Sequence, residues 1–395
     1  MFNPQEIYAP AIDNNQLVPR VFISPQRYIQ GNGVLEDAGR YMSLLQSRRS
    51  AVLVSQRGLV ADGGRLIASL EAADIEVVVS TFNGECSLAE IDSHVTKLAE
   101  ESVDCLIAVG GGKCVDAGKA VAYRLAVPIV IVPTLASNDA PCSALSVIYT
   151  PAGVTAGVES YPASPALVIV DTGVVAEAAE RYLAAGMGDA MATWYEARVC
   201  LENEKARTPL GARPTLASCA LGEICAQTLY AHGRAAAKAV VENMVDEPLE
   251  KVVEANTLLS GIGFESGGIA AAHGIAQSYT AIPQVHDNYL HGEMVAMGLV
   301  AQLVMESKID EASKVATFFA SVGLPVHLGQ ISLGPGDNAH LDTVAEVAVA
   351  FPLMHNMPFP VTADVVKTAV LDAHELGLSV AAAQGDVAYR RLQAG

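Results

Sequence analysis

One segment of the chain reads Cys105-Leu106-Ile107-Ala108-Val109-Gly110-Gly111-Gly112-Lys113-Cys114-Val115-Asp116-Ala117-Gly118-Lys119-Ala120. It begins with an apolar run, continues through three glycines and ends in a stretch with helical spacing, which is typical of a buried strand, a tight turn and an amphipathic helix. Glycines let the backbone approach a phosphate closely, and the free N–H groups and dipole at the start of a helix favour an anion. The pattern therefore favours a nucleotide pyrophosphate site. An ordinary strand-to-helix turn remains open, because the motif is neither G-x-G-x-x-G nor a P-loop.

Similar apolar runs recur on both sides of this segment and predict a parallel sheet. They alternate with helical stretches, and near-continuous apolar strands separated by helices are typical of a sheet that is covered on both faces. The first half of the chain is therefore expected to be α/β. The predicted strands are Ser50–Val54, Ile75–Val79, Cys105–Val109, Pro128–Val132 and Ala166–Val170.

The second half of the chain has a different pattern, and we expect it to be helical. From about Ala178 onward, long Ala/Leu/Glu-rich segments have helical spacing and strand candidates are almost absent. We therefore predict an α/β dinucleotide-binding domain over residues 1–177 and a helical domain over residues 178–395, with the site in the cleft between them. The helical segments are Pro214–Ala236, Pro248–Ser278, Gly292–Ser307 and Ala363–Leu378.

The composition argues against several classes of function. The 395 residues are 51% hydrophobic and 17% charged, with a formal net charge of -19, so we expect repulsion from nucleic acids and from anionic membrane surfaces. Met1–Arg20 lacks the apolar core of a signal peptide, and no run of about 18 apolar residues predicts a membrane span. The seven cysteines are scattered without C-x-x-C spacing, which indicates reduced thiols in a cytoplasmic protein.

A polar loop follows the strand after the glycine-rich turn. It runs from Pro133 to Ser143 and offers hydroxyls at Thr134 and Ser137 and a carboxylate at Asp139. Open α/β sheets bind ligands at the carboxyl ends of their strands, where this loop is expected to lie. The two loops together favour a nucleotide site, although Asn-Asp turn chemistry would also explain the second loop.

One carboxylate and two histidines stand out in the apolar, helical half. Asp189 and His273 each lie in an Ala/Gly-rich stretch, and His291 begins the next apolar helix. One carboxylate and two imidazoles would hold a divalent metal and leave a coordination position open, as a catalytic site requires. Taken singly, Asp189 is explained by helix capping, and a histidine on an apolar helix is more often a hydrogen-bonded core residue than a ligand. His286 and His355 compete for the same role, so spacing alone leaves the ligand set open.

Taken together, these segments resemble the glycerol dehydrogenases, members of the metal-dependent, iron-type (group III) alcohol dehydrogenase superfamily. The resemblance covers nearly the whole chain and implies an N-terminal Rossmann-like domain followed by an all-helical domain, the architecture also found in dehydroquinate synthase. It implies an oxidoreductase with a nicotinamide cofactor, a catalytic zinc or iron in the cleft, and a homo-oligomer, an octamer by resemblance. The segments that carry it are Ser24–Gly31, Asn83–Cys86, the glycine-rich turn, Ala140–Thr150, Gly188–Ala190, Gly263–Gly268, the two histidine motifs and His355–Pro358.

The resemblance also implies roles for individual residues. The metal ligands match Asp189, His273 and His291, which puts His286 and His355 in second place. Asp139 matches the aspartate that contacts the substrate polyol, and with the three ligands it completes the predicted catalytic set. The cofactor contacts match Gly111, Gly112, Lys113, Asp116, Thr134, Ser137, Ser143, Leu145 and Tyr149.

Two positions depart from the pattern of the family. The family usually carries an aspartate after the second strand, suited to the adenosine ribose, but this chain reads Val54-Ser55-Gln56-Arg57. The repulsion against a 2′-phosphate is then lost, and Arg57 is available to pair with one. After the first histidine the family continues with a second one, whereas this chain reads Ala276-Gln277-Ser278, and we expect Ala276 to reshape the substrate pocket.

The prediction is a reversible NAD-linked oxidation of glycerol to dihydroxyacetone, or of a related small vicinal diol or secondary alcohol. One divalent metal is expected, zinc before iron, although two imidazoles and a carboxylate suit both. The alternative is a paralogue that acts on another hydroxy compound, such as a 2-hydroxy acid, with NADP. A lyase of the dehydroquinate synthase type is disfavoured because it needs a cationic pocket and basic residues are sparse, and a catalytically idle paralogue is disfavoured because every expected ligand is present.

Overall fold

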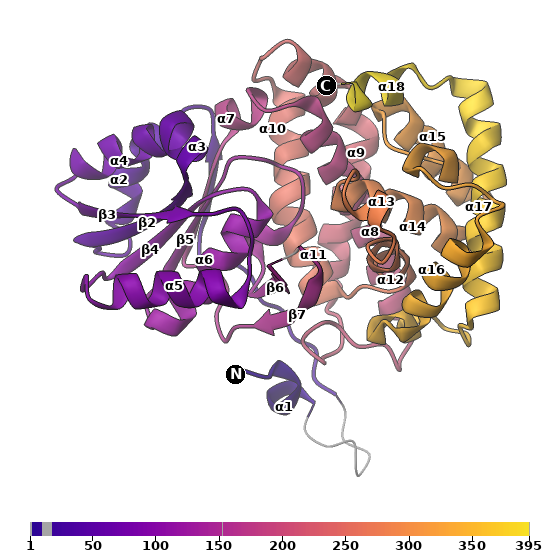
Figure 1. Cartoon of the computed structure of the whole chain (residues 1–395), viewed down its shortest axis with the longest axis horizontal. Helices are drawn as coiled ribbons and strands as arrows, with labels where there is room; N and C mark the ends of the chain where they lie inside the picture. The colour runs from indigo at the N-terminus through magenta and orange to yellow at the C-terminus, as the bar shows by residue number, and fades with distance from the viewer. Residues whose placement is uncertain (1, 10–17, 152, 395) are drawn as a thin grey trace.

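The computed structural model describes residues 2–9, 18–151 and 153–394 and consists of two domains that lie side by side (Figure 1). The first is a parallel sheet with helices on both faces, and the second is helical, as the sequence predicts. Residues 10–17, which belong to the segment expected to lack a signal peptide, lie outside the described residues. No described helix combines the length and the apolar character needed to cross a bilayer.

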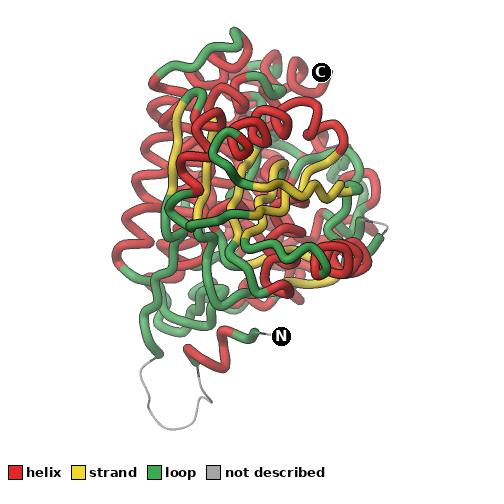
Figure 2. The backbone as a smooth tube through the Cα atoms, turned by 90° about the vertical axis from the view of Figure 1, so that its left-hand side faces the viewer, coloured by secondary structure: helices red, strands yellow, loops and turns green. Residues whose placement is uncertain are grey.

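The sheet has six strands in the order β1-β8-β5-β4-β2-β3, and every pairing in it is parallel. Figure 2 looks onto this domain and shows the strands in yellow among the helices. The carboxyl ends of the neighbouring β4 and β5 are in register, with Gly110 paired to Pro133, so the glycine-rich turn and the polar loop leave the sheet side by side. The strands are β1 (Tyr28–Gly31), β2 (Arg49–Ser55), β3 (Glu76–Phe82), β4 (Cys105–Gly110), β5 (Ile129–Pro133) and β8 (Leu167–Asp171).

Helices cover the sheet on both faces because its strands are apolar on both sides. One buried cluster joins β2, β4 and β8 to helices α2 and α4, and the other joins the opposite sides of these strands to α5 and α6. Each of the five predicted strands is present, with no end shifted by more than three residues. The helices and helical turns in this part of the chain are α1 (Pro4–Tyr8), η1 (Val34–Asp37), α2 (Ala38–Met42), α3 (Gln56–Gly58), η2 (Leu59–Gly63), α4 (Gly64–Glu71), α5 (Leu88–Ala99), α6 (Gly112–Leu125), η3 (Ala140–Cys142) and α7 (Thr172–Ala176).

An antiparallel hairpin of β6 (Leu145–Tyr149) and β7 (Thr155–Ser160) leaves the main sheet and was not predicted. Its strands are short and only half-buried, so they lack the continuous apolar run that identifies the other strands. At its tip the carbonyl oxygen of Gly153 lies 2.9 Å from Nε2 of His286 on α13 (Pro283–His286). The hairpin thus reaches the helical domain, and His286 has a structural partner there.

The helical domain packs its longer helices around a shared apolar core. The helix α14 is buried along most of its length, as expected for a helix that is apolar on all sides. The helices are α8 (Glu180–Glu202), α9 (Leu216–Val241), α10 (Glu247–Glu254), η4 (Ala255–Leu259, a π-helical turn), α11 (Ser260–Gly267), α12 (Ala271–Tyr279), α13, α14 (His291–Met305), α15 (Ile309–Val322), η5 (Leu328–Ile331), α16 (Asn338–Ala350), η6 (Pro352–Asn356), α17 (Ala363–Gln384) and α18 (Val387–Gln393).

The predicted helical segment Pro248–Ser278 is interrupted between α11 and α12. Gly268 has a φ of 102°, a conformation that glycine adopts readily and that ends α11. The next helix then begins at Ala271, with His273 in its first turn. The interruption therefore sets the direction in which His273 leaves the backbone.

Two glycines let α14 touch its neighbours backbone to backbone. A Cβ atom at Gly292 would lie 1.8 Å from the carbonyl oxygen of Ala185 on α8, and one at Gly298 would lie 2.2 Å from that of Ala272 on α12. Neither position has room for a side chain. The three helices α8, α12 and α14, which carry Asp189, His273 and His291, are therefore held at the shortest possible separations.

Candidate metal and dinucleotide site

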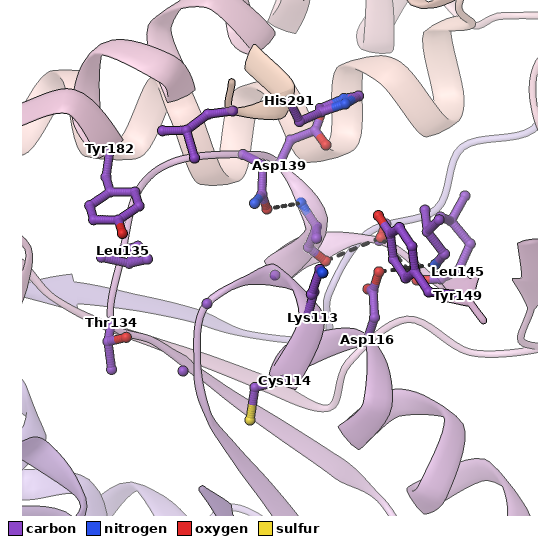
Figure 3. A pocket seen from close by; sticks show the side chains of 18 of the residues that line it. Lys113, Cys114, Asp116, Thr134, Leu135, Asp139, Leu145, Tyr149, Tyr182 and His291 are labelled. Atoms are coloured by element: carbon purple, nitrogen blue, oxygen red, sulfur yellow. Dashed lines mark hydrogen bonds between the residues drawn. The ribbon is translucent and has the colours of Figure 1, made fainter. Parts of the chain in front are cut away.

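A cavity of about 1420 Å³ lies between the two domains and is lined by residues of both. It is larger than the roughly 300–1,000 Å³ of ordinary small-molecule pockets, so a dinucleotide and a second molecule fit together. Figure 3 shows part of its wall, with His291 at the top, Asp139 beneath it, and Lys113 and Cys114 of α6 lower down. The seven cysteines, Cys114 included, are buried and unpaired, as predicted for reduced thiols.

Asp189, His273 and His291 come together where the cavity meets the helical domain. One ligand atom from each lies within 4.8 Å of the others, and Nε2 of either histidine is 3.4 Å from Oδ1 of Asp189. That oxygen is fully buried and has no hydrogen-bond donor among the described residues, which is costly unless a cation balances it. The His291 side chain is 47% exposed. The donor set, its spacing and the orphaned oxygen fit a divalent metal with an open coordination side.

The electrostatics of the cluster agree with a cation site. Burial by itself would raise the pKa of Asp189, but the two histidines outweigh burial and hold that pKa far below its usual value. Burial would lower the pKa of His273, but the Glu196 and Asp189 carboxylates outweigh it and raise that pKa well above its usual value. The carboxylates around His273 therefore favour positive charge at this point, which a proton supplies here and a divalent metal would supply when bound.

Glu196 is the important residue of this cluster that the sequence analysis missed. Its side chain is fully buried, and its Oε1 accepts the backbone N–H groups of Ala270 and His273 at 2.7 and 3.0 Å. Its Oε2 lies 2.5 Å from Nδ1 of His273. A carboxylate at this nitrogen fixes the proton on Nδ1 and leaves the lone pair of Nε2 facing Asp189. The sequence did contain a signal for Glu196: it follows Asp189 by seven residues, so the two side chains share one face of α8.

The two other candidate histidines lie outside the cluster. Both ring nitrogens of His286 have other partners: Nε2 lies 2.9 Å from the carbonyl oxygen of Gly153, and Nδ1 lies 3.0 Å from the carboxylate of Asp287. His355 is exposed in η6. Among the described residues, Asp189, His273 and His291 form the one cluster of suitable donors.

Asp139 approaches the cluster from the α/β domain. Its backbone N–H donates to Oδ2 of Asp189 at 3.3 Å, and its own carboxylate accepts the hydroxyl of Ser260 at 2.9 Å. Burial and the charge of Asp189 raise the pKa of Asp139 well above its usual value. Ser260, which the sequence analysis did not single out, follows the π-helical turn η4, and such turns are frequent at functional sites.

The glycine-rich turn forms the nearby wall of the α/β domain. Helix α6 begins at Gly112, where a Cβ atom would lie 2.7 Å from the side-chain amide of Asn138, so the position has no room for a side chain. The Nζ of Lys113 is 2.7 Å from Oε2 of Glu85 and 4.9 Å from the ring centre of Tyr149. The predicted cofactor residues that line the cavity are Gly111, Gly112, Lys113, Asp116, Thr134, Ser143, Leu145 and Tyr149; Ser137 is not among its lining residues.

A buried lysine organises the predicted residues around it. Nζ of Lys119 donates to Oδ1 of Asp116 at 3.0 Å, to Oγ of Ser143 at 3.0 Å, and to the carbonyl oxygens of Ala140 and Leu145 at 2.7 and 2.6 Å. Asp116 also accepts the N–H of Val147. These bonds tie α6 to the polar loop and to the hairpin, so Asp116 and Ser143 shape the wall of the cavity as well as lining it.

The two segments that depart from the family pattern, Gln56-Arg57 and Ala276-Gln277, lie at different parts of the cavity wall. Ser55 and Arg57 line the cavity, and so do the carboxylates of Asp62 and Glu177. At the other part, Ala276 is fully buried and does not line the cavity, whereas Gln277 does. Residues four apart share a helix face, so Gln277 lies on the same side of α12 as His273, while the effect expected of Ala276 on the substrate pocket stays a prediction.

The chain is similar to known proteins over most of its length. The family model described as iron-containing alcohol dehydrogenase matches residues 25–172. A glycerol dehydrogenase of Escherichia coli is 43% identical over 362 residues, which are 91% of this chain and 97% of that protein. A glycolaldehyde reductase of Halobacterium salinarum is 40% identical, with 91% and 98% covered. The crystal structure of a glycerol dehydrogenase from Schizosaccharomyces pombe matches with a TM-score of 0.87 and 33% identity, over 93% of both chains.

Proposed function

The chain belongs to the iron-containing alcohol dehydrogenase family, among the glycerol dehydrogenases, and is an oxidoreductase; from its site we propose that it oxidises glycerol, or a related small vicinal diol, reversibly with NAD. The observation that carries the proposal is the cluster of Asp189, His273 and His291. Its orphaned carboxylate oxygen lies beside a cavity whose other wall is the glycine-rich turn. A metal at these three residues and a dinucleotide at the glycine-rich turn would therefore lie next to each other in one cavity.

Asp189, His273 and His291 would hold one divalent metal, and zinc is our first choice because three protein ligands with an open position are typical of catalytic zinc. The metal supplies a Lewis acid that lowers the pKa of a substrate hydroxyl. Glu196 keeps the imidazole of His273 in the tautomer with a free Nε2. The backbone contact of α14 with α8 at Gly292 holds His291 close to Asp189.

The dinucleotide would lie along the α/β wall of the cavity, with its pyrophosphate at the start of α6. When bound, NAD accepts the hydride from the carbinol carbon, and the protein supplies its alignment. Asp62 and Glu177 support NAD, because a 2′-phosphate placed near them meets two carboxylates, while Arg57 keeps NADP as the alternative. We accordingly propose residues 1–177 as the dinucleotide-binding domain and residues 178–395 as the metal- and substrate-binding domain.

Asp139 would orient the substrate by accepting a hydrogen bond from the hydroxyl beside the reacting one. Asp139 offers no positive charge to a substrate carboxylate, so the site favours a neutral diol over a 2-hydroxy acid. The lining that the helical domain contributes carries no lysine or arginine among the described residues, which also disfavours a phosphorylated acid and a lyase of the dehydroquinate synthase type.

The experiment is a comparison of substrates and cofactors. The zinc-loaded enzyme is assayed at mildly alkaline pH with glycerol, 1,2-propanediol, 2,3-butanediol and a 2-hydroxy acid, each with NAD and with NADP. We expect a diol with NAD to give the highest kcat/KM, and His273→Ala to abolish turnover. A preference for the 2-hydroxy acid, or full activity of His273→Ala, would overturn the proposal.

We further propose that the protein works in the cytoplasm as a homo-oligomer, with the octamer as the expected form. The buried, unpaired cysteines fit a reducing compartment. Size-exclusion chromatography with light scattering tests the assembly, and a monomer at assay concentrations would contradict it.

A further inference from the structure

The last helix, α18, is held against the helical domain by one apolar and two polar side chains. Leu392 is buried. Arg391 forms an ion pair with Glu180, the first residue of α8, and its Nη2 lies 2.6 Å from Oε1. Gln393 donates from Nε2 to Oε1 of Glu293, the third residue of α14, at 2.9 Å. Helix α18 therefore bridges the first turns of α8 and α14, the helices that carry two of the three candidate metal ligands.

Glu293 is a buried carboxylate, and donors surround both of its oxygens. Its Oε1 accepts from Nε of Arg181 and from Nε2 of Gln393, each at 2.9 Å. Its Oε2 accepts from Nη2 of Arg181 at 2.8 Å and from the backbone N–H of Leu290 at 2.7 Å. Because the side chain is only 1% exposed, a donor that is lost leaves the charge short of a hydrogen bond, which is costly.

The same contacts fix the segment in which His291 lies. Arg181 also donates to the carbonyl oxygen of Asn288 at 2.7 Å, and Glu293 holds the N–H of Leu290. His291 is the next residue and begins α14. The chain on either side of His291 is thus tied to one buried ion pair, that of Arg181 with Glu293.

The imidazole of His291 depends on these contacts more than that of His273 does. Glu196 orients His273 through Nδ1, whereas no carboxylate other than that of Asp189 pairs with His291 among the described residues. A ligating histidine is usually oriented by a partner at its second ring nitrogen. His291 is therefore placed through its backbone, and the side chain of Glu293 holds that backbone.

We propose that Gln393 and Arg391 of α18 are positioning residues for the candidate metal ligand His291. Gln393 acts through Glu293, and Arg391 keeps α18 seated on α8. The inference rests on the proposed function, because it takes the three candidate ligands as a metal site. Loss of both side chains leaves Glu293 one hydrogen bond short and loosens the start of α14. The worth of one ordinary hydrogen bond corresponds to a loss of about three- to ten-fold in metal affinity.

The test is the zinc affinity of the apoprotein, measured by competition with a chromophoric chelator well below the unfolding temperature. The double variant Arg391→Ala/Gln393→Ala should raise the zinc Kd by about three- to ten-fold. Arg390→Ala is the matched control, because Arg390 lies on the same helix but pairs with Asp386 at the start of that helix. It should keep the wild-type Kd. Arg391→Lys, which retains a cation beside Glu180, should also keep it.

A second readout separates positioning from mere stabilisation of the fold. With zinc at saturating concentration, the double variant should have a lower kcat for glycerol and an unchanged KM for NAD, because the glycine-rich turn belongs to the other domain. A lower unfolding temperature with a zinc Kd within two-fold of that of Arg390→Ala would make α18 a stabilising element only and overturn the inference. If the zinc Kd rises as expected but the wild type turns over no diol, the proposed function fails and the role of α18 stands.

Discussion

Replacing Glu196 by Gln should weaken zinc binding by about ten- to a hundred-fold, although Glu196 is not itself a candidate ligand. In the native arrangement Oε1 accepts the two backbone N–H groups of Ala270 and His273, and Oε2 faces Nδ1 of His273. Glutamine keeps the oxygen for the backbone and presents an NH₂ group to the imidazole. The ring must then accept at Nδ1 and carry its proton on Nε2, the atom that faces Asp189.

The expected size follows from the one bond that changes. Since the two backbone bonds are retained, the loss is a single hydrogen bond to a charged group, about 1.5–3 kcal/mol. At about 1.4 kcal/mol for each factor of ten, this is again one to two powers of ten in affinity. The fold should be preserved, because the substitution is isosteric.

The assay is a competition titration of the apoprotein with zinc and a chromophoric chelator, which reports affinity independently of turnover. Glu265→Gln is the matched control: Glu265 is also a buried glutamate on a helix, but both its oxygens accept only the N–H of Ala144. It should bind zinc as the wild type does. A zinc Kd of Glu196→Gln within two-fold of the control would refute the tautomer argument.

Three further outcomes are expected. Asp139→Asn should lower kcat/KM for glycerol in steady-state assays by about two- to ten-fold, the worth of one ordinary hydrogen bond, while the zinc affinity in the competition titration stays unchanged. Asp62→Asn should raise the ratio of kcat/KM with NADP to that with NAD by about two- to five-fold, because a carboxylate near the 2′-phosphate is removed; a constant ratio would contradict this. Burial raises the pKa of Glu265 to about 7, so the folded protein retains a proton that the unfolded chain has already lost, and stability should fall between about pH 4.5 and 7 by about 3 kcal/mol. Thermal unfolding at pH 5 and 8 should show a smaller fall in stability in Glu265→Gln than in the wild type.

Strands β2, β4, β5 and β8 of the main sheet could be predicted because both their faces are buried. Runs such as Cys105–Val109 and Ala166–Val170 leave no polar position for an alternative reading. Strand β1 and the β6–β7 hairpin were missed for the opposite reason, since they are half-buried and carry polar residues. The single helix expected over Pro248–Ser278 was interrupted at Gly268, where a tertiary contact of Cys200 leaves no room for a Cβ.

The site was harder to predict than the fold, because its residues are far apart in sequence. Spacing alone left His286 and His355 beside the three candidate ligands, and only the family resemblance ranked them. Glu196 and Lys119 were missed because a buried charge and a surface charge look the same in sequence. What distinguishes them is a partner on another element: the imidazole of His273 for Glu196, and the hydroxyl of Ser143 and two carbonyl oxygens for Lys119.

The two domains contribute different residues to the site. Asp189, His273 and His291 stand on three helices of the helical domain, whereas Asp139 and the glycine-rich turn belong to the α/β domain. Any motion that parts the domains carries the dinucleotide wall and Asp139 away and leaves the three donors together. Under the proposed function, exchange of the dinucleotide would therefore not require release of the metal, and the supply of metal would set how many molecules are active without setting how fast each one turns over.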